Sequence, residues 1–193
     1  MVILNVITAP TEEPVSLPEI KDHLRITSEE EHLLLNGYAL AARQLVEMWS
    51  RRALITQTLE LALEVWPSCD RIQLPSPPLQ AVTWVKYVDS SGVTQTMSAA
   101  DYVVDTASQP GGVILGYGKS WPSATLQPGP AITVRYTAGY GTASQVPAIY
   151  KQAILLIIGH FYENREEVAP GNVRLQQIPL AARMLLTIDR GAF

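Results

Sequence analysis

Residues 58–65 read Thr-Leu-Glu-Leu-Ala-Leu-Glu-Val, and this stretch sets the fold class. Apolar side chains occupy every second position from Leu59 to Val65, which is the period of a strand whose successive side chains point to opposite faces. The stretch therefore predicts a half-buried β-strand. Helical patterns lie on both sides of it along the chain, so the expected fold class is α+β.

The strand pattern continues through the middle of the chain. Segments rich in β-branched and aromatic residues predict further strands at 81–88, 93–97, 102–104, 112–115 and 131–136. Asp89-Ser90-Ser91-Gly92 is a turn sequence between the first two of these. Pro75, Pro77 and Pro78 cannot donate to a ladder, so their segment is expected to be a connector or an edge. Residues 53–146 thus predict a small antiparallel sheet or sandwich.

Two helices are expected before this β-rich portion. Ser16-Leu17-Pro18-Glu19 has the spacing of a capping box, and the helix that it opens should end near Arg25. A second box, from Ser28 to Glu31, should open a longer helix. Its apolar residues recur at helical spacing: Leu33, Leu34, Tyr38, Ala41, Leu45, Val46 and Trp49. Arg51 and Arg52 suit the negative end of this helix.

Helical pattern returns at Pro147, a residue type favoured at the first helical position. Apolar residues between Ile149 and Tyr162 cover most of the circumference, so this helix is expected to be buried centrally or shared with a partner. Pro170-Gly171 breaks it, and a short final helix should run from Pro179 to about Asp189. Residues 1–52 and 147–193 are expected to form one discontinuous helical bundle domain, with residues 53–146 as an inserted small antiparallel β domain.

The composition excludes several classes of protein. The 193 residues carry a formal net charge of −4, whereas binding to nucleic-acid phosphates normally requires a basic surface. Cys69 is the single cysteine, so no intrachain disulfide can form, as expected of a chain assembled in a reducing cytoplasm. No apolar run approaches the roughly 20 residues that span a bilayer, so no membrane association is expected.

One segment resembles a nucleotide site. Gly116-Tyr117-Gly118-Lys119-Ser120 ends like a phosphate-binding loop, whose backbone amides cradle phosphate while the lysine neutralises its charge. That pattern also needs a glycine where Val113 stands, and a helix where Trp121-Pro122 follows. A nucleotide-binding enzyme using Gly116–Ser120 is therefore kept only as a remote alternative.

The remaining polar residues do not form a pattern typical of catalysis. The three histidines, at positions 23, 32 and 160, lack the spacing of metal ligands. No nucleophile motif stands in a supporting context. We therefore expect a protein that is not an enzyme and has no cofactor or metal.

Several phrases of the sequence, taken in order, resemble the head–tail connector (adaptor) proteins of tailed phages, in the subfamily with a β-rich insertion. Leu17 to Arg25 is similar to the family's opening L-x-E-x-K-x-x-L-R helix, and Val46 to Leu54 to its V-E-x-x-[TS]-x-R-x-L phrase. Similar segments follow at 72–75, 78–82, 85–92, 138–141, 146–147 and 162–166. The resemblance extends from about Ser16 to Asp189.

The resemblance implies a structural virion protein of the head–tail junction, assembled in the cytoplasm of a bacterial host. Such connectors form a ring beneath the portal protein, commonly of about twelve subunits, and extend the DNA channel. A downstream stopper or tail-completion protein binds to them. Genomic DNA is expected to pass without specific binding, along a bore for which Glu29–Glu31 and turns of the β region are candidates. Another head-completion or tail-completion (stopper-type) role is the main alternative.

Interface residues are expected among side chains near the helix ends. Candidates for contact with a neighbouring subunit or the portal are Trp49, Arg51, Arg52, Phe161, Tyr162, Arg165, Arg174, Leu175, Arg183 and Leu186. Arg165 follows an apolar helix, where its guanidinium would cap the last carbonyls or pair with a neighbouring subunit. The segment from Asn172 onward is expected either to dock on the portal or to fold back on its own domain.

Overall fold

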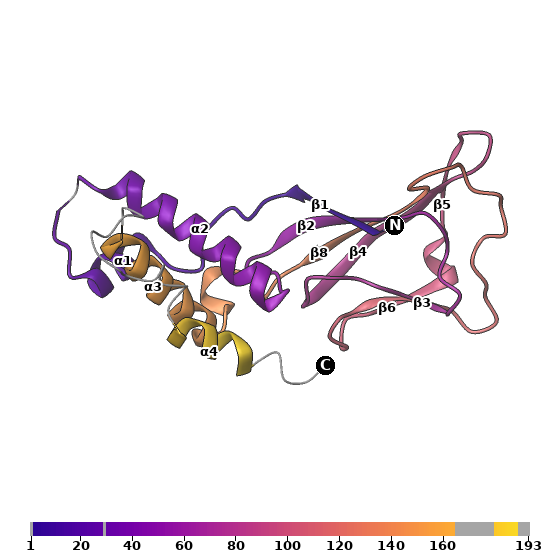
Figure 1. Ribbon diagram of the computed structural model, residues 1–193. Coiled ribbons are helices and arrows are strands. Elements are labelled where there is room, and N and C mark those ends of the chain that lie inside the picture. The colour runs from indigo at the N-terminus through magenta and orange to yellow at the C-terminus, as the bar shows by residue number, and fades with distance from the viewer. Residues whose placement is uncertain (1, 29, 165–179, 189–193) are drawn as a thin grey trace. The chain divides into compact units, whose positions relative to one another are not determined.

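The computed structural model describes residues 2–28, 30–164 and 180–188, and the chain divides into two compact units (Figure 1). The first unit contains Met1–Pro10 and Thr56–Tyr140, and the second contains Thr11–Ile55 and Gly141–Phe193. Antiparallel strands build the first and helices build the second, so the α+β class is confirmed. None of the described helices is long and apolar enough to cross a bilayer.

The β unit contains two antiparallel sheets. The larger has the order β1-β2-β8-β4-β5, with β1 at Val2–Thr8, β2 at Gln57–Leu63, β4 at Leu79–Val88, β5 at Thr94–Thr96 and β8 at Ile132–Ala138. The smaller has the order β3-β7-β6, with β3 at Arg71–Gln73, β6 at Tyr102–Asp105 and β7 at Gly112–Leu115. A single 3₁₀ turn, η1 (Ala99–Asp101), leads into β6. Each strand predicted from the sequence is observed, with its ends moved by a few residues.

The centre of the larger sheet is the pair formed by β2 and β8. Leu59 lies opposite Tyr136, and Leu61 lies opposite Val134. All four side chains are at most 2% exposed. Burial raises the pKa of Tyr136, whose hydroxyl donates to the Pro75 carbonyl at 2.8 Å. The alternation at residues 58–65 therefore places leucines in the core, as predicted.

The amino-terminal residues differ from the expectation. Val2–Thr8 forms β1 and pairs with β2, whereas the sequence placed residues 1–52 in the helical domain. β1 is a nearly continuous apolar run, Val-Ile-Leu-Asn-Val-Ile-Thr, so no alternation reveals it as a strand. Its hydrogen-bonded partner begins at Gln57, and a pairing over that distance in sequence is decided by the tertiary fold.

The helical unit contains four described α-helices. They are α1 (Leu17–Leu24), α2 (His32–Ser50), α3 (Ala148–Glu163) and α4 (Leu180–Ile188), and the 3₁₀ turn η2 (Ala143–Gln145) precedes α3. α3 packs against each of the other three helices (Figure 1). Five of its side chains are buried: Tyr150, Ala153, Ile154, Ile157 and Ile158. The apolar circumference of this helix thus reflects a central position in its own unit.

Of the two predicted capping boxes, the first is confirmed and the second is wrong. The Glu19 amide donates to the Ser16 hydroxyl at 3.4 Å, and the Ser16 amide donates to the Glu19 carboxylate at 2.6 Å. α2 begins at His32 without a side-chain cap. Ser28 instead accepts from the Glu30 amide at 3.2 Å, and Glu31 accepts from the Tyr162 hydroxyl at 2.7 Å. A tertiary contact with α3 thus uses the carboxylate that the second box required.

Candidate functional site

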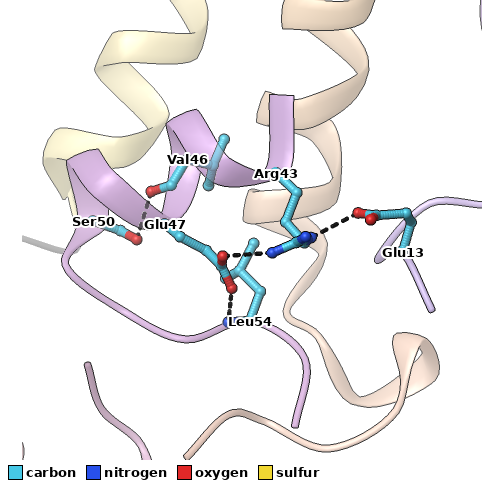
Figure 2. Close-up of polar contacts among 6 residues, drawn as sticks. All are labelled: Glu13, Arg43, Val46, Glu47, Ser50 and Leu54. Atoms are coloured by element: carbon cyan, nitrogen blue, oxygen red, sulfur yellow. Dashed lines mark hydrogen bonds and ion pairs between the residues drawn. The ribbon is translucent and has the colours of Figure 1, made fainter. Parts of the chain in front are cut away.

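A buried ion pair fixes α2 within the helical unit. The guanidinium of Arg43 lies between two carboxylates, at 2.7 Å from Glu13 and 2.7 Å from Glu47 (Figure 2). Arg43 is only 5% exposed. Charged groups persist at such burial when they are paired and hydrogen-bonded. The pair therefore ties α2 to the segment that precedes α1.

The same cluster directs the chain where α2 ends. The second carboxylate oxygen of Glu47 accepts from the Leu54 amide at 2.9 Å, and the Ser50 hydroxyl donates to the Val46 carbonyl at 2.7 Å (Figure 2). Arg51 adopts a left-handed conformation with φ 55° and ends the helix. Ala53, Leu54 and Ile55 are then fully buried. The hydrogen bonds within residues 46–54 therefore fix the end of α2 and direct the following residues into the core.

Burial raises the pKa of Glu47, while its hydrogen bond from the Leu54 amide and its contact with Arg43 act in the opposite direction. Loss of either donor would therefore raise the pKa of this carboxyl further. The position of α2 and the connection that follows it are thus coupled through one side chain.

With α2 held in this way, its outward face is well defined, and that face is uncharged. Its exposed residues are Leu33, Asn36, Gly37, Leu40, Ala41, Gln44 and Met48. They recur at intervals of three and four residues, so they share one side of the helix. Leu33 is 89% exposed and Met48 is 68% exposed. An exposed helix face normally carries charged residues, and a face without them is typical of a protein–protein contact.

Two small residues lie within this uncharged face of α2. A methyl group added at Gly37 would meet no atom within 4 Å, and Ala41 stands one turn further on. Small side chains at this spacing allow a second helix to approach closely. The face therefore offers a shallow central strip between exposed Leu33 and Met48.

The sequence did not reveal this face. The predicted apolar stripe of α2 included Leu33 and Ala41, which are exposed, and Val46, which is buried. It omitted Leu35, Ala39 and Ala42, which α2 also buries. Apolar residues surround most of this helix, so its periodicity is compatible with more than one stripe. The absence of charged residues among the positions from Leu33 to Met48 that share this side was the signal that could have identified the outward face.

α4 also exposes apolar side chains. Leu180 is 71% exposed and Met184 is 62% exposed, one turn apart on the helix. Ala182 and Leu186 face inward and are buried. α4 therefore attaches to its unit by one side, and its outward side presents two apolar side chains beside the exposed Arg183.

The predicted interface residues do not gather on one surface. Trp49 is half-buried on α2, Arg51 is exposed at its end, and Arg183 is exposed on α4. Phe161 and Tyr162 are half-buried on α3, where the ring of Phe161 lies 5.8 Å from that of Tyr38. Arg52 and Leu186 are only 9% and 3% exposed. The remaining three, Arg165, Arg174 and Leu175, lie outside the described residues, so the interface assignment stays a prediction.

The segment Gly116–Ser120 lacks the geometry of a phosphate-binding loop. The Lys119 amide donates to the Gly116 carbonyl at 3.0 Å, which closes a turn, and no helix follows. The Lys119 ammonium lies 2.8 Å from the Asp101 carboxylate. Among the described residues, no group of three or more His, Cys, Asp or Glu side chains could hold a metal ion.

Comparison with known proteins gives matches among solved structures. No protein-family model and no curated protein matches the chain. A chain of the "Virion of native gene transfer agent (GTA) particle" aligns with a TM-score of 0.76 at 27% identity, covering 96% of this chain and 94% of that one. A chain of the "Neck of empty GTA particle computed with C6 symmetry" gives 0.77 at 29% identity, covering 97% and 94%. A chain of the "Neck of native GTA particle computed with C12 symmetry" gives 0.72 at 29%, covering 97% and 94%.

These similarities extend over nearly the full length of both chains. They relate the chain to the structural neck proteins of phage-like virions.

Proposed function

We propose that the chain is an adaptor of the head–tail neck, which forms a ring beneath the portal of a phage or phage-like particle and extends its DNA channel. The observation that carries this proposal is the full-length similarity to a chain of a particle neck with C12 symmetry, at 29% identity. The sequence, which carries no motif typical of catalysis, accords with a virion role.

A ring requires a head-to-tail contact, in which two different surfaces of each subunit meet and the rotation closes. The uncharged face of α2 is one such surface. The outward side of α4 is a suitable second surface because Leu180 and Met184 are exposed there, beside Arg183. We assign the subunit contact to these two helices, with α4 of one copy against the strip at Gly37 and Ala41 of the next.

The finer assignments are part of the same proposal. The portal is the partner above the ring, a stopper or tail-completion protein is the partner below it, and DNA passes through the bore without specific binding. A net charge of −4 favours passage, since like charges repel the phosphates. A stopper-type protein would differ in one respect, because it would bind an adaptor ring and not the portal.

The test is the assembly of a double variant, Leu40→Glu with Met48→Glu. Both side chains are exposed, at 43% and 68%, so the fold should tolerate the change while the contact between subunits does not. The matched control makes the same change at two exposed valines of the β unit, Val93→Glu with Val103→Glu. Size is measured by analytical ultracentrifugation, and rings are counted by electron microscopy, with and without co-produced portal.

We expect rings, alone or on the portal, for the unmodified chain and the control, and monomers for the α2 variant. Rings formed by the α2 variant at the level of the control would contradict the assignment of the contact. If the chain does not bind the portal but binds a preformed adaptor ring, it is a stopper and not an adaptor.

A further inference from the structure

Among the described strands, β1 leaves one edge of the larger sheet unpaired. It stands first in the order β1-β2-β8-β4-β5, and within the described residues it pairs with β2 alone (Figure 1). The register is regular from Val2 to Val6 before an irregularity near Thr8. Such an edge presents a row of backbone amides and carbonyls that are open to solvent and can pair with another extended chain.

β1 lacks the features that usually protect an edge from pairing. Natural sheets shorten an exposed edge strand or place charges and prolines on it. β1 has seven residues, Val-Ile-Leu-Asn-Val-Ile-Thr, with no charge and no proline. Val2 is 68% exposed and Val6 is 58% exposed. The strand is therefore both long and apolar at an edge.

The other edges of the two sheets are different. β5 has three residues, Thr-Gln-Thr. β3 has three residues including Arg71, and β6 has four including Asp105. Among the described strands, only β1 combines length with the absence of charge at an edge.

A groove begins beside β1 on one face of the sheet. It has a volume of about 620 Å³, and its lining includes Val2, Leu61, Leu63, Ile72 and Pro75. Val2 is opposite Leu63 in the ladder, and Leu4 is opposite Leu61, so these side chains share the face that the groove follows. A strand added along β1 would place every second side chain on this face of the sheet, and those next to Val2 would lie nearest to the groove.

We propose that β1 binds an extended segment of another protein of the particle, which adds to the sheet as a sixth strand. The backbone of β1 recognises the extended chain, and the groove selects apolar side chains at alternate positions. The partner segment is accordingly uncharged, free of proline at its donor positions, and alternating in polarity.

A second copy of this chain fits the edge poorly. Pairing of β1 with β1 of another copy is a twofold contact, which closes at two subunits. A head-to-tail contact would need a different edge on the neighbour, and the other described edges are short and polar or charged. This step rests on the proposed ring, because a ring of many subunits excludes the twofold contact as its repeating unit.

The single cysteine provides a measurement on the unmodified chain. Cys69 is exposed and belongs to the lining of the groove, so a bound segment should shield its thiol from a disulfide reagent. The probe is a short blocked peptide that alternates valine with threonine, and its control carries proline in place of the central valines. We expect the first peptide to slow the reaction of Cys69 by about tenfold near saturation and the second to leave it unchanged.

Two double variants locate the binding. Leu4→Lys with Val6→Lys places charge on the exposed side of β1, and should weaken binding of the valine–threonine peptide by about tenfold or more. Thr94→Lys with Gln95→Lys makes the same change of charge on the opposite edge, β5, and should have no effect. Hydrogen exchange of the unmodified chain should show new protection in residues 2–8 when the peptide is bound.

An unchanged rate for Cys69 with the valine–threonine peptide overturns the proposal. Shielding of Cys69 that increases with the concentration of the chain alone also overturns it, because the occupant is then a second copy. Ring assembly is measured separately. β1 variants that still form rings but no longer bind the peptide support this inference. Loss of rings in the α2 variant bears on the proposed function and leaves this inference unchanged.

Discussion

Replacing Arg43 with methionine removes a buried cation while keeping a side chain of similar length. Two carboxylates would then lose their partner: Glu47, whose side chain is 15% exposed, and Glu13, at 28%. Removing one partner of a buried pair costs about 3–5 kcal/mol, because an uncompensated charge stays behind. Glu13 remains partly solvated, so we expect a loss near the lower end, about 3 kcal/mol in the free energy of unfolding.

Urea denaturation followed by far-ultraviolet circular dichroism measures this loss, since the helical unit dominates that signal. With a slope of about 2 kcal/mol per molar urea, the midpoint should fall by about 1.5 M. The control is Arg135→Met, which breaks a 2.7 Å pair with Glu60 in which the arginine side chain is 34% exposed. Surface pairs contribute about 0–1 kcal/mol, so the control midpoint should move by less than about 0.5 M.

The pH dependence of the stability deficit provides an independent test. Burial already raises the pKa of Glu47, and loss of the Arg43 cation removes one of the influences that lower it. The folded state would then bind a proton more tightly than the unfolded state, so the deficit of Arg43→Met should shrink as pH falls. Equal midpoint shifts for Arg43→Met and Arg135→Met, or a deficit that grows in acid, would refute this account of the cluster.

Two further predictions concern the β unit and α1. Hydrogen bonds from Ser108 and from Arg71 hold the pKa of Asp105 at about 2, below its usual 3.8. Asp105→Asn should therefore lower stability above pH 3.8, and the difference from the unmodified chain should vanish as pH falls to about 2. Thermal unfolding monitored by tryptophan fluorescence measures this difference. Ser16→Ala removes the cap of α1 and should cost about 1 kcal/mol in urea unfolding, whereas Ser28→Ala, whose hydroxyl caps no helix, should cost clearly less. Equal losses in the two serine variants would contradict the role of the box.

Much of the fold was predictable because its signals are local. The alternation at residues 58–65 and the box at Ser16 each depend on neighbours within a few residues, and the structure places β2 and α1 there. The box at Ser28 failed for the opposite reason, since Glu31 is held by Tyr162, which lies 131 residues away. A motif of four neighbouring residues cannot reveal a competing contact with a residue so distant in sequence.

The candidate contact surface was only partly predictable. A helix over residues 32–50 followed from its apolar spacing, but the choice of its buried side depended on where α3 lies. Arg43 illustrates the point, because a charged residue in the middle of a helix is expected at the surface. Its burial became possible once Glu13, far away in sequence, supplied a partner.

The sequence by itself determined the α+β class, the type of most elements, and the resemblance to neck proteins, because periodicity and ordered phrases are carried by the chain. The tertiary structure alone decided that Val2–Thr8 is an open sheet edge and that the uncharged side of α2 faces outward. Both depend on contacts between residues far apart in the chain, and a surface is defined only by what the rest of the molecule leaves uncovered.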